Sequence, residues 1–269
     1  MDRPALRPLA RLLRLVRGLF HLPPGRRRIA VAFAYGAACH TLFALAVIAM
    51  IVAMFFGMSE SFGRVPDPWS HLANAFLVLQ FPLSHSVLLS ARGRRALRWL
   101  APRDYAGTLG TTTFALVASL QLLALFALWT PSGIVWWRAE GVWLAVTCTL
   151  YALSWLLLIW ASYDAGAEVQ SGALGWMSLA QSIKPNFPDM PTAGLFRVIR
   201  QPIYVSFALT LWTVPVWTPD QLALAVVLTA YCLLAPRLKE ARFRKRYGAR
   251  FDAYRAKVPY ALPRLRRKA

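Results

Sequence analysis

The sequence predicts an all-α membrane protein, a polytopic bundle of about six transmembrane helices with amphipathic N- and C-terminal segments. Two observations lead to this prediction. Of the 269 residues, 58% are hydrophobic and 11 are tryptophan, and the mean hydropathy is +0.45, which is unusual for a soluble domain. Several apolar runs also approach the ~20 residues that a helix needs to cross the hydrocarbon core of a bilayer.

The apolar runs fix the expected crossings. We predict spans at 29–57, 72–90, 108–129, 141–162, 202–217 and 221–236. The last two are short, and Trp217-Thr-Pro-Asp220 between them is typical of the tip of a tight hairpin.

The basic residues predict the orientation. The chain has 31 Lys and Arg against 11 acidic residues. All but Arg64 and Arg138 lie in residues 1–28, 91–107, 163–201 and 237–269. By the positive-inside rule these segments, including both termini, are cytoplasmic. The expected partners of this charge are anionic lipid headgroups rather than nucleic acid.

The N-terminal segment, residues 1–28, is basic and amphipathic. Its first arginines recur at helical spacing with leucines between them, at Arg3, Arg7, Arg11, Arg14 and Arg17. This pattern favours a helix on the inner membrane surface. An organellar transit peptide has a similar composition and is the alternative.

The second span carries an unusual group of polar residues. Gln80, Ser84, His85 and Ser86 surround Pro82 within an otherwise apolar run. Polar groups at membrane depth tend to face the interior of the bundle, where they serve function. A kinked helix whose side chains satisfy nearby backbone groups explains the pattern equally well. The three cysteines lie within spans and suit packing, and no residue spacing predicts a metal site.

The run from Gly194 to Tyr204 carries the first candidate chemistry. Pro202 suits the first turn of a helix, and the free backbone N–H groups there favour an anion. Arg197 and Arg200 are three residues apart, so we expect them to share a helical face that binds a carboxylate.

The segment after the last span carries the second group of residues with candidate chemistry. Pro236 is expected to end or kink that span, which places Glu240 at the water boundary, where its carboxylate would accept hydrogen bonds from a ligand. An aromatic and apolar stripe follows at spacings of 4, 4, 3 and 4, in the order Phe243, Tyr247, Phe251, Tyr254 and Val258.

Together the two segments resemble the paired signature of integral-membrane methyltransferases of the isoprenylcysteine carboxyl methyltransferase and phospholipid methyltransferase group. That signature is Gly-x-x-x-x-x-Arg-His-Pro-x-Tyr, a helical hairpin, Glu-Glu, and Phe-Gly-x-x-Tyr-x-x-Tyr. The Ser84-His-Ser86 segment and Trp136-Trp137 are similar to the bacterial branch of methanethiol S-methyltransferases and NnrU-type proteins. The chain has no Gly-x-Gly-x-x-Gly loop.

The resemblance implies a fold and a site. Residues 29–162 are the first four helices, and residues 163–269 are the cofactor-binding region. The methyl donor would be S-adenosyl-L-methionine, with S-adenosyl-L-homocysteine as product. We expect Arg200, Glu240 and His85 to be catalytic. The implied cofactor contacts are Gly194, Leu195, Arg197, Arg200, Gln201, Pro202, Tyr204, Glu240, Tyr247 and Tyr254.

Two departures from the signature matter for the chemistry. Gln201 replaces its histidine, and Lys239 replaces its first glutamate. Gln201 cannot act as a base, which a thiol acceptor tolerates better than an amine. We therefore expect methylation of a small or lipophilic thiol in a bacterial inner membrane, with the active site cytoplasmic. The alternatives are methylation of an isoprenylcysteine carboxylate or a phospholipid amine, and a non-catalytic NnrU-like accessory or transport protein.

Overall fold

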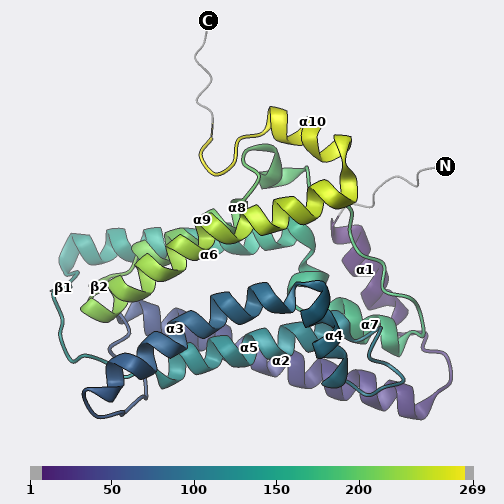
Figure 1. Ribbon diagram of the computed structural model, residues 1–269, viewed down its shortest axis with the longest axis horizontal. Coiled ribbons are helices and arrows are strands. Elements are labelled where there is room, and N and C mark those ends of the chain that lie inside the picture. Colours follow the sequence, from purple (N-terminus) through teal and green to yellow (C-terminus); the bar gives the residue numbers. More distant parts are fainter. Residues whose placement is uncertain (1–7, 264–269) are drawn as a thin grey trace, which may run out of the picture.

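The computed structural model describes residues 8–263, and its helices form one bundle (Figure 1). The prediction of an all-α polytopic bundle is confirmed. The elements are α1 (Pro8–Gly18), α2 (Arg26–Phe55), α3 (Trp69–Leu88), α4 (Ala91–Trp99), α5 (Gly110–Leu128), β1 (Trp137–Arg138), α6 (Gly141–Gln170), α7 (Ala173–Ala180), the 3-10 helix η1 (Gly194–Arg197), α8 (Pro202–Trp212), β2 (Val216–Trp217), α9 (Pro219–Tyr247) and α10 (Ala249–Lys257).

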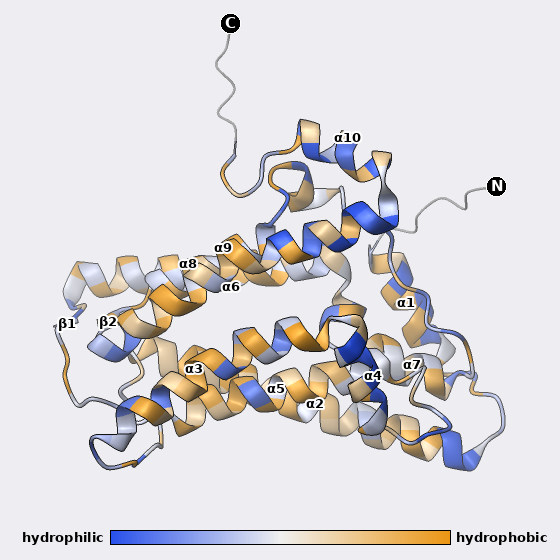
Figure 2. Cartoon of the chain, in the orientation of Figure 1, coloured by the Kyte–Doolittle hydropathy of each residue, from blue (hydrophilic) through white to orange (hydrophobic). Residues whose placement is uncertain are grey.

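Within the described residues, four helices are long and apolar enough to cross a membrane: α2, α5, α6 and α9. A fifth crossing results if α3 and α4, which meet at 98°, are counted as one bent span. The protein is therefore an integral membrane protein. Most of the strongly polar residues lie on α1, α4 and the C-terminal part of α9, whereas the opposite half of the bundle is mainly apolar (Figure 2).

The prediction of a membrane span at 202–217 is wrong. Helix α8 has only 11 residues, roughly 16 Å of helix, about half the thickness of a hydrocarbon core. The helix ends at Trp212 because Pro215 disfavours helical backbone at the residue before it. The chain then runs extended into β2.

The extended segment forms a small clasp that the sequence did not predict. Strand β2 pairs antiparallel with β1, with Trp137 opposite Trp217. This pairing joins the segment before α6 to the turn between α8 and α9, at the end of the bundle remote from α1 and α10 (Figure 1). The predicted hairpin tip is present: Thr218 caps α9 by accepting a hydrogen bond from the Gln221 N–H at 2.9 Å.

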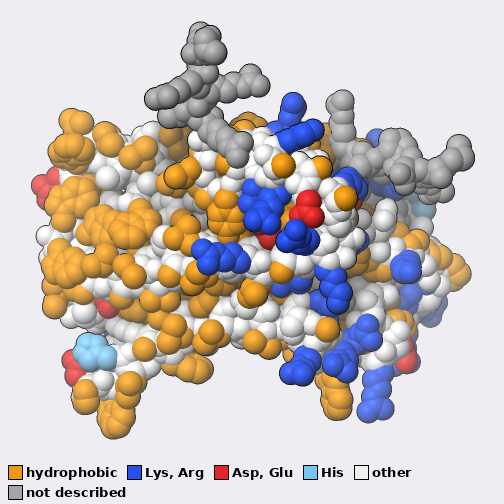
Figure 3. Space-filling model, turned by 45° about the horizontal axis from the view of Figure 1, so that its top comes forward, with side chains coloured by type: hydrophobic (Ala, Val, Ile, Leu, Met, Phe, Trp, Pro, Cys, Tyr) orange, Lys and Arg blue, Asp and Glu red, His pale blue; other side chains and the backbone are white. Residues whose placement is uncertain are grey.

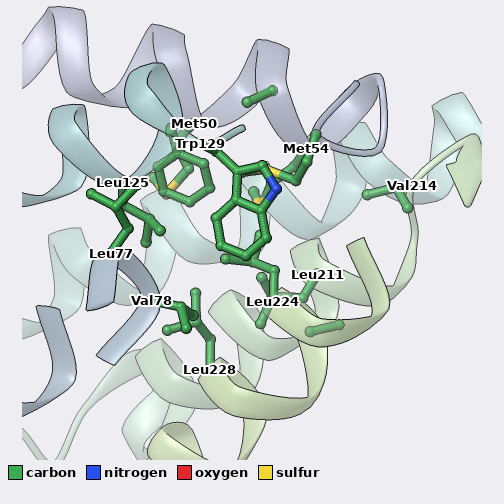
Figure 4. Close-up of a cluster of buried hydrophobic side chains, with 14 of the residues drawn as sticks. Met50, Met54, Leu77, Val78, Leu125, Trp129, Leu211, Val214, Leu224 and Leu228 are labelled. Atoms are coloured by element: carbon green, nitrogen blue, oxygen red, sulfur yellow. The ribbon is translucent and has the colours of Figure 1, made fainter. Parts of the chain in front are cut away.

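A cluster of buried side chains fills the clasp end of the bundle. Met54 of α2, Leu125 and Trp129 at the end of α5, Leu211 of α8 and Leu224 of α9 pack together there (Figure 4). The nearby carboxylate of Asp220, in the first turn of α9, accepts hydrogen bonds from the Trp129 indole at 3.0 Å and from the Ser132 N–H at 2.9 Å. A buried charge is tolerable when it is hydrogen-bonded in this way.

The N-terminal helix is present at Pro8–Gly18, and Arg3 and Arg7 of the predicted helix lie outside the described residues. One of its arginines faces the protein rather than solvent. Arg11 donates to the buried carboxylate of Glu168 at 2.8 Å, and the Leu15 carbonyl accepts from the Gln181 amide at 2.9 Å. These contacts fix α1 on α6 and the end of α7.

We expected Pro236 to end or kink the last span, and α9 does not end there but continues to Tyr247. Contacts beyond Pro236 compensate for the loss of one backbone hydrogen bond: Glu240 pairs with Arg200, and Lys239 lies against the Phe196 ring. The 29 residues of α9 extend roughly 44 Å, so the C-terminal part of the helix projects beyond a ~30 Å core. The helix ends at Gly248, whose φ of +50° lies in the region that favours glycine.

The two ends of the bundle differ sharply in charge. Lys and Arg side chains gather over one half of the face shown in Figure 3, and the other half is largely apolar. The loop around residue 65 lies at the clasp end, where Gly57 accepts a hydrogen bond from Thr218. Reporter fusions after residue 65 and after residue 269 should therefore report opposite sides of the membrane. Signals from the same side would contradict this topology.

Candidate active site

The candidate site begins where the chain enters α8. Arg200 is buried, and its guanidinium forms a bidentate ion pair with the carboxylate of Glu240 on α9. Nε donates to Oε1 at 2.8 Å, and Nη2 donates to Oε2 at 3.4 Å. Paired contacts of this kind are strong because both the charges and the planes match. The contact holds the start of α8 against the C-terminal part of α9.

The same arginine also holds the chain that follows α10. Its Nη1 donates to the Val258 carbonyl at 2.6 Å and to the Arg255 carbonyl at 3.2 Å, and its backbone N–H donates to the Pro259 carbonyl at 2.9 Å. The guanidinium carbon lies 5.5 Å from the Tyr260 ring centre. Arg200 is thus the junction of three segments.

The two positions that depart from the signature contact each other. The Lys239 ammonium donates to Gln201 Oε1 at 3.1 Å, and Gln201 Nε2 donates to Glu240 Oε1 at 2.8 Å. An amide accepts on one side and donates on the other, so Gln201 matches a cation and an anion at once. A residue between two glutamates would instead have to donate to both.

Lys239 is surrounded by aromatic rings. Its Nζ lies 5.4 Å from the ring centre of Phe196, 5.7 Å from that of Tyr204 and 5.5 Å from that of Phe243. Ring faces attract a cation at these distances. Lys239 forms no ion pair with another residue of the 8–263 range.

A cavity of about 710 Å³ lies next to this network, between α9, α8, α5, α3 and α2. Among the residues that line it are His85, Tyr204, Tyr231, Lys239, Arg242 and Tyr247. Of the residues predicted from the sequence, it therefore collects His85, Tyr204 and Tyr247.

Arg200, Gln201, Glu240 and Tyr254 line a separate, much smaller void. Four residues line both spaces and so form the wall between them: Pro191, Phe196, Lys239 and Phe243. The structure thus divides the residues expected in one site into a cavity wall and a supporting network. No sequence pattern signals this division, because all of these residues fall in the same two motifs.

The polar group on α3 is divided in the same way. Gln80 donates a hydrogen bond to the Gln121 carbonyl at 3.0 Å, and the Ser84 hydroxyl donates one to the Gln80 carbonyl. These two residues therefore satisfy nearby backbone groups, which was one of the two interpretations of the pattern. His85 instead lines the cavity, with its ring 4.9 Å from Phe114. Its Nδ1 is buried and has no hydrogen-bond partner among the described residues. His85 therefore fits the other interpretation, a polar residue that faces the interior of the bundle and serves function.

The segment before Arg200 differs from expectation. Arg197 is exposed whereas Arg200 is buried, so the two do not share a face. The reason is that η1 is a short 3-10 helix that ends at Arg197. The Leu195 N–H donates to the Asp164 carboxylate at 2.8 Å. Gly194 has a φ of +57°, and a Cβ there would lie 2.1 Å from that carboxylate, which explains the glycine.

Tyr254 fastens α10 to this segment. Its hydroxyl donates to the Phe196 carbonyl at 2.6 Å, and burial raises the pKa of Tyr254 to about 12. Its role is to hold the small void closed rather than to line the large cavity. Pro202 is at the first position of α8, as predicted.

No family model matches the chain. It is 27% identical to the methanethiol S-methyltransferase of Pseudomonas deceptionensis over 201 residues, 74% of this chain and 75% of the relative. It is also 27% identical to methanethiol S-methyltransferase 1 of Bradyrhizobium diazoefficiens over 241 residues, 87% and 82% of the two chains. The chain is related to bacterial methanethiol S-methyltransferases. The resemblance inferred from the two motifs is confirmed.

Similarity extends beyond these bacterial proteins. Nurim of Xenopus laevis is 27% identical over 200 residues, 65% of this chain and 67% of the relative.

The buried Arg200–Glu240 pair gives a testable prediction. Glu240→Ala leaves a buried guanidinium unpaired and should lower the free energy of unfolding by ~3–5 kcal/mol. Arg200→Met with Glu240→Met together should cost less than the sum of the single changes. Arg244→Met is the control, because its pair with Asp252 is exposed and is worth under ~1 kcal/mol. Equal small losses in all variants would show that the pair is not structural.

Proposed function

We propose that this protein is an S-adenosylmethionine-dependent membrane methyltransferase that methylates a small or lipophilic thiol. The observation that carries the proposal is the 710 Å³ cavity, whose wall joins signature residues of the C-terminal region to His85 of α3. Its volume lies within the ~300–1,000 Å³ typical of small-molecule sites. The names of the bacterial relatives support transfer to a thiol.

The chemistry of the wall fits the donor. S-Adenosylmethionine carries a carboxylate, an ammonium, a ribose, an adenine and a sulfonium. Arg242 and Arg246 suit the carboxylate, and the rings of Tyr247 and Phe243 suit the adenine. When bound, this cofactor supplies an electrophilic methyl group. We propose that Arg200 and Glu240 position α8 and α9 around it, since each is already occupied by the other.

Residues of the wall have two tasks in this proposal. The first is alignment, which can supply ~7–11 kcal/mol of the barrier to an in-line displacement. The second is to favour the thiolate. A thiol with a pKa near ~8.5 is partly ionised at neutral pH, so a strong base is unnecessary. His85 Nδ1, which lies at the cavity and has no hydrogen-bond partner within residues 8–263, would accept the thiol proton.

The proposal extends to location. We propose a bacterial inner membrane with the cavity and the basic segments on the cytoplasmic side, where anionic lipids attract them. A second candidate function is a non-catalytic accessory or transport role. The observation that favours it is that Arg200 and Glu240 satisfy each other, as a purely structural pair does.

Methyl transfer from a radiolabelled donor, measured with purified protein and a panel of thiols, lipid amines and isoprenylcysteine carboxylates, tests the function. We expect label in thiols. Transfer to amines or carboxylates alone would replace the thiol proposal. Binding of S-adenosylhomocysteine without transfer to any acceptor would favour the accessory role.

The placement of the cofactor has its own test. Tyr247→Ala should weaken S-adenosylhomocysteine binding about tenfold, because stacking of a base on an aromatic ring is worth ~1–3 kcal/mol. Trp99→Ala is the control, since Trp99 is 89% exposed and does not line the cavity. Calorimetric affinities that are the same for both variants would exclude Tyr247 from the cofactor site.

The proposed role of His85 predicts a change in pH dependence. In His85→Gln the thiol would have to ionise without help, so the rate should fall most at low pH and recover as pH rises and the thiolate fraction grows. The measurement is kcat against pH for one thiol. A variant with a parallel profile at a uniformly lower rate would assign His85 a packing role only.

A further inference from the structure

The cavity wall carries more positive charge than the described residues neutralise. Arg94 and Arg98 of α4 and Arg242 and Arg246 of α9 line it together with Lys239. None of the five forms an ion pair within the part of the chain that the structure describes. The four arginines are exposed to solvent, whereas Lys239 is only partly exposed, and this excess of positive charge favours an anion in the cavity.

The acidic residue that lines this cavity, Asp189, does not neutralise these five cations. Its carboxylate accepts a hydrogen bond from Arg250, which lowers the pKa of Asp189 and keeps it paired. Glu240 is the other nearby acid, and Arg200 and Gln201 occupy it.

Lys239 differs from the four arginines in its surroundings. The arginines lie toward the basic surface, whereas the Lys239 ammonium is held among the rings of Phe196, Tyr204 and Phe243. Gln201 Oε1 accepts a hydrogen bond from the Lys239 ammonium at 3.1 Å. The ammonium has three N–H donors, so the other two are available to a ligand. An ammonium in such an apolar setting interacts strongly with an anion because little water screens it.

Gln201 explains why the ammonium stays in place. Its amide nitrogen is bound to Glu240, which Arg200 holds rigidly, so its oxygen points toward Lys239. The network of four residues thus presents a fixed positive charge to the cavity. A glutamate at position 239 would present a negative charge at the same place.

We propose that Lys239 selects an anionic methyl acceptor by binding the acceptor's thiolate. This inference rests on the proposed function and names the ionic form of its substrate. The thiol loses its proton to solvent or His85, and the thiolate sulfur forms a bond to the methyl carbon. The carbon–sulfur bond of the sulfonium breaks, and that sulfur keeps the electron pair. Both products are neutral thioethers at sulfur.

This assignment has two consequences. A protonated amine is repelled by Lys239, so lipid amines are poor acceptors. The methylated product has lost the charge that Lys239 binds, so it leaves more readily than the thiolate. Both follow from the sign of one side chain rather than from the shape of the cavity.

Two probes of similar size test the inference by calorimetry in a zwitterionic detergent. Hexanesulfonate is a permanent anion with a short apolar tail, and hexyl methyl sulfide is its neutral counterpart. We expect Lys239→Gln to weaken hexanesulfonate binding about tenfold or more and to leave sulfide binding unchanged. Lys239→Arg, which keeps the charge, should retain most of the anion affinity.

Lys245→Gln is the matched control, because Lys245 is exposed on the same helix and does not line the cavity. A thermal melt of each variant shows whether it is folded. Hexanesulfonate binding that is equal in wild type and a folded Lys239→Gln would overturn the inference. Lys239-dependent anion binding in a protein that methylates no acceptor would support this site and refute the proposed reaction alone.

Discussion

The ion pair between Arg200 and Glu240 is the interaction on which the rest of the C-terminal region depends. It joins α8 to α9 at the point where the hairpin is furthest from the clasp of β1 and β2. The guanidinium also binds carbonyls of the chain after α10, so one side chain organises three segments. A buried arginine can do this because its five donors lie in one plane and stay charged.

The pair also determines what its neighbours do. Glu240 fixes Gln201, and Gln201 fixes Lys239 at the cavity wall. A void too small for a ligand lies on one side of that wall, and a cavity large enough for one lies on the other. The residues of the two signature motifs therefore fall into two groups. Arg200, Gln201 and Glu240 hold the helices together, and Tyr204, Lys239 and Tyr247 line the cavity. In this chain Gln201 and Lys239 contact each other, and Lys239 presents a positive charge to the cavity.

Hydropathy and charge predicted the all-α bundle because long apolar runs and asymmetric arginines are properties of single segments. The same reasoning failed where a contact between distant segments decides the outcome. Pro236 does not end α9, and the residues beyond it contact Arg200 and Phe196, which are distant in sequence. Helix α8 is half a span, because the chain leaves it to pair with β1.

Within the site, the sequence indicated the correct motifs but not the orientation of their side chains. Arg197 and Arg200 seemed to share a face only on the assumption of a regular α-helix, and η1 is not one. The role of Lys239 was hidden for a similar reason. Its partner Gln201 is 38 positions away, and nothing in the sequence predicted a contact between them.

We propose that the large cavity receives the cofactor while the Arg200–Glu240 pair stays closed beside it. A structure of the protein with S-adenosylhomocysteine bound would decide this. We expect the adenosyl group in the cavity next to Tyr247, the homocysteine sulfur on the Lys239 side of the wall, and an intact pair. A ligand inserted between Arg200 and Glu240, with its ribose on the Glu240 carboxylate, would contradict it.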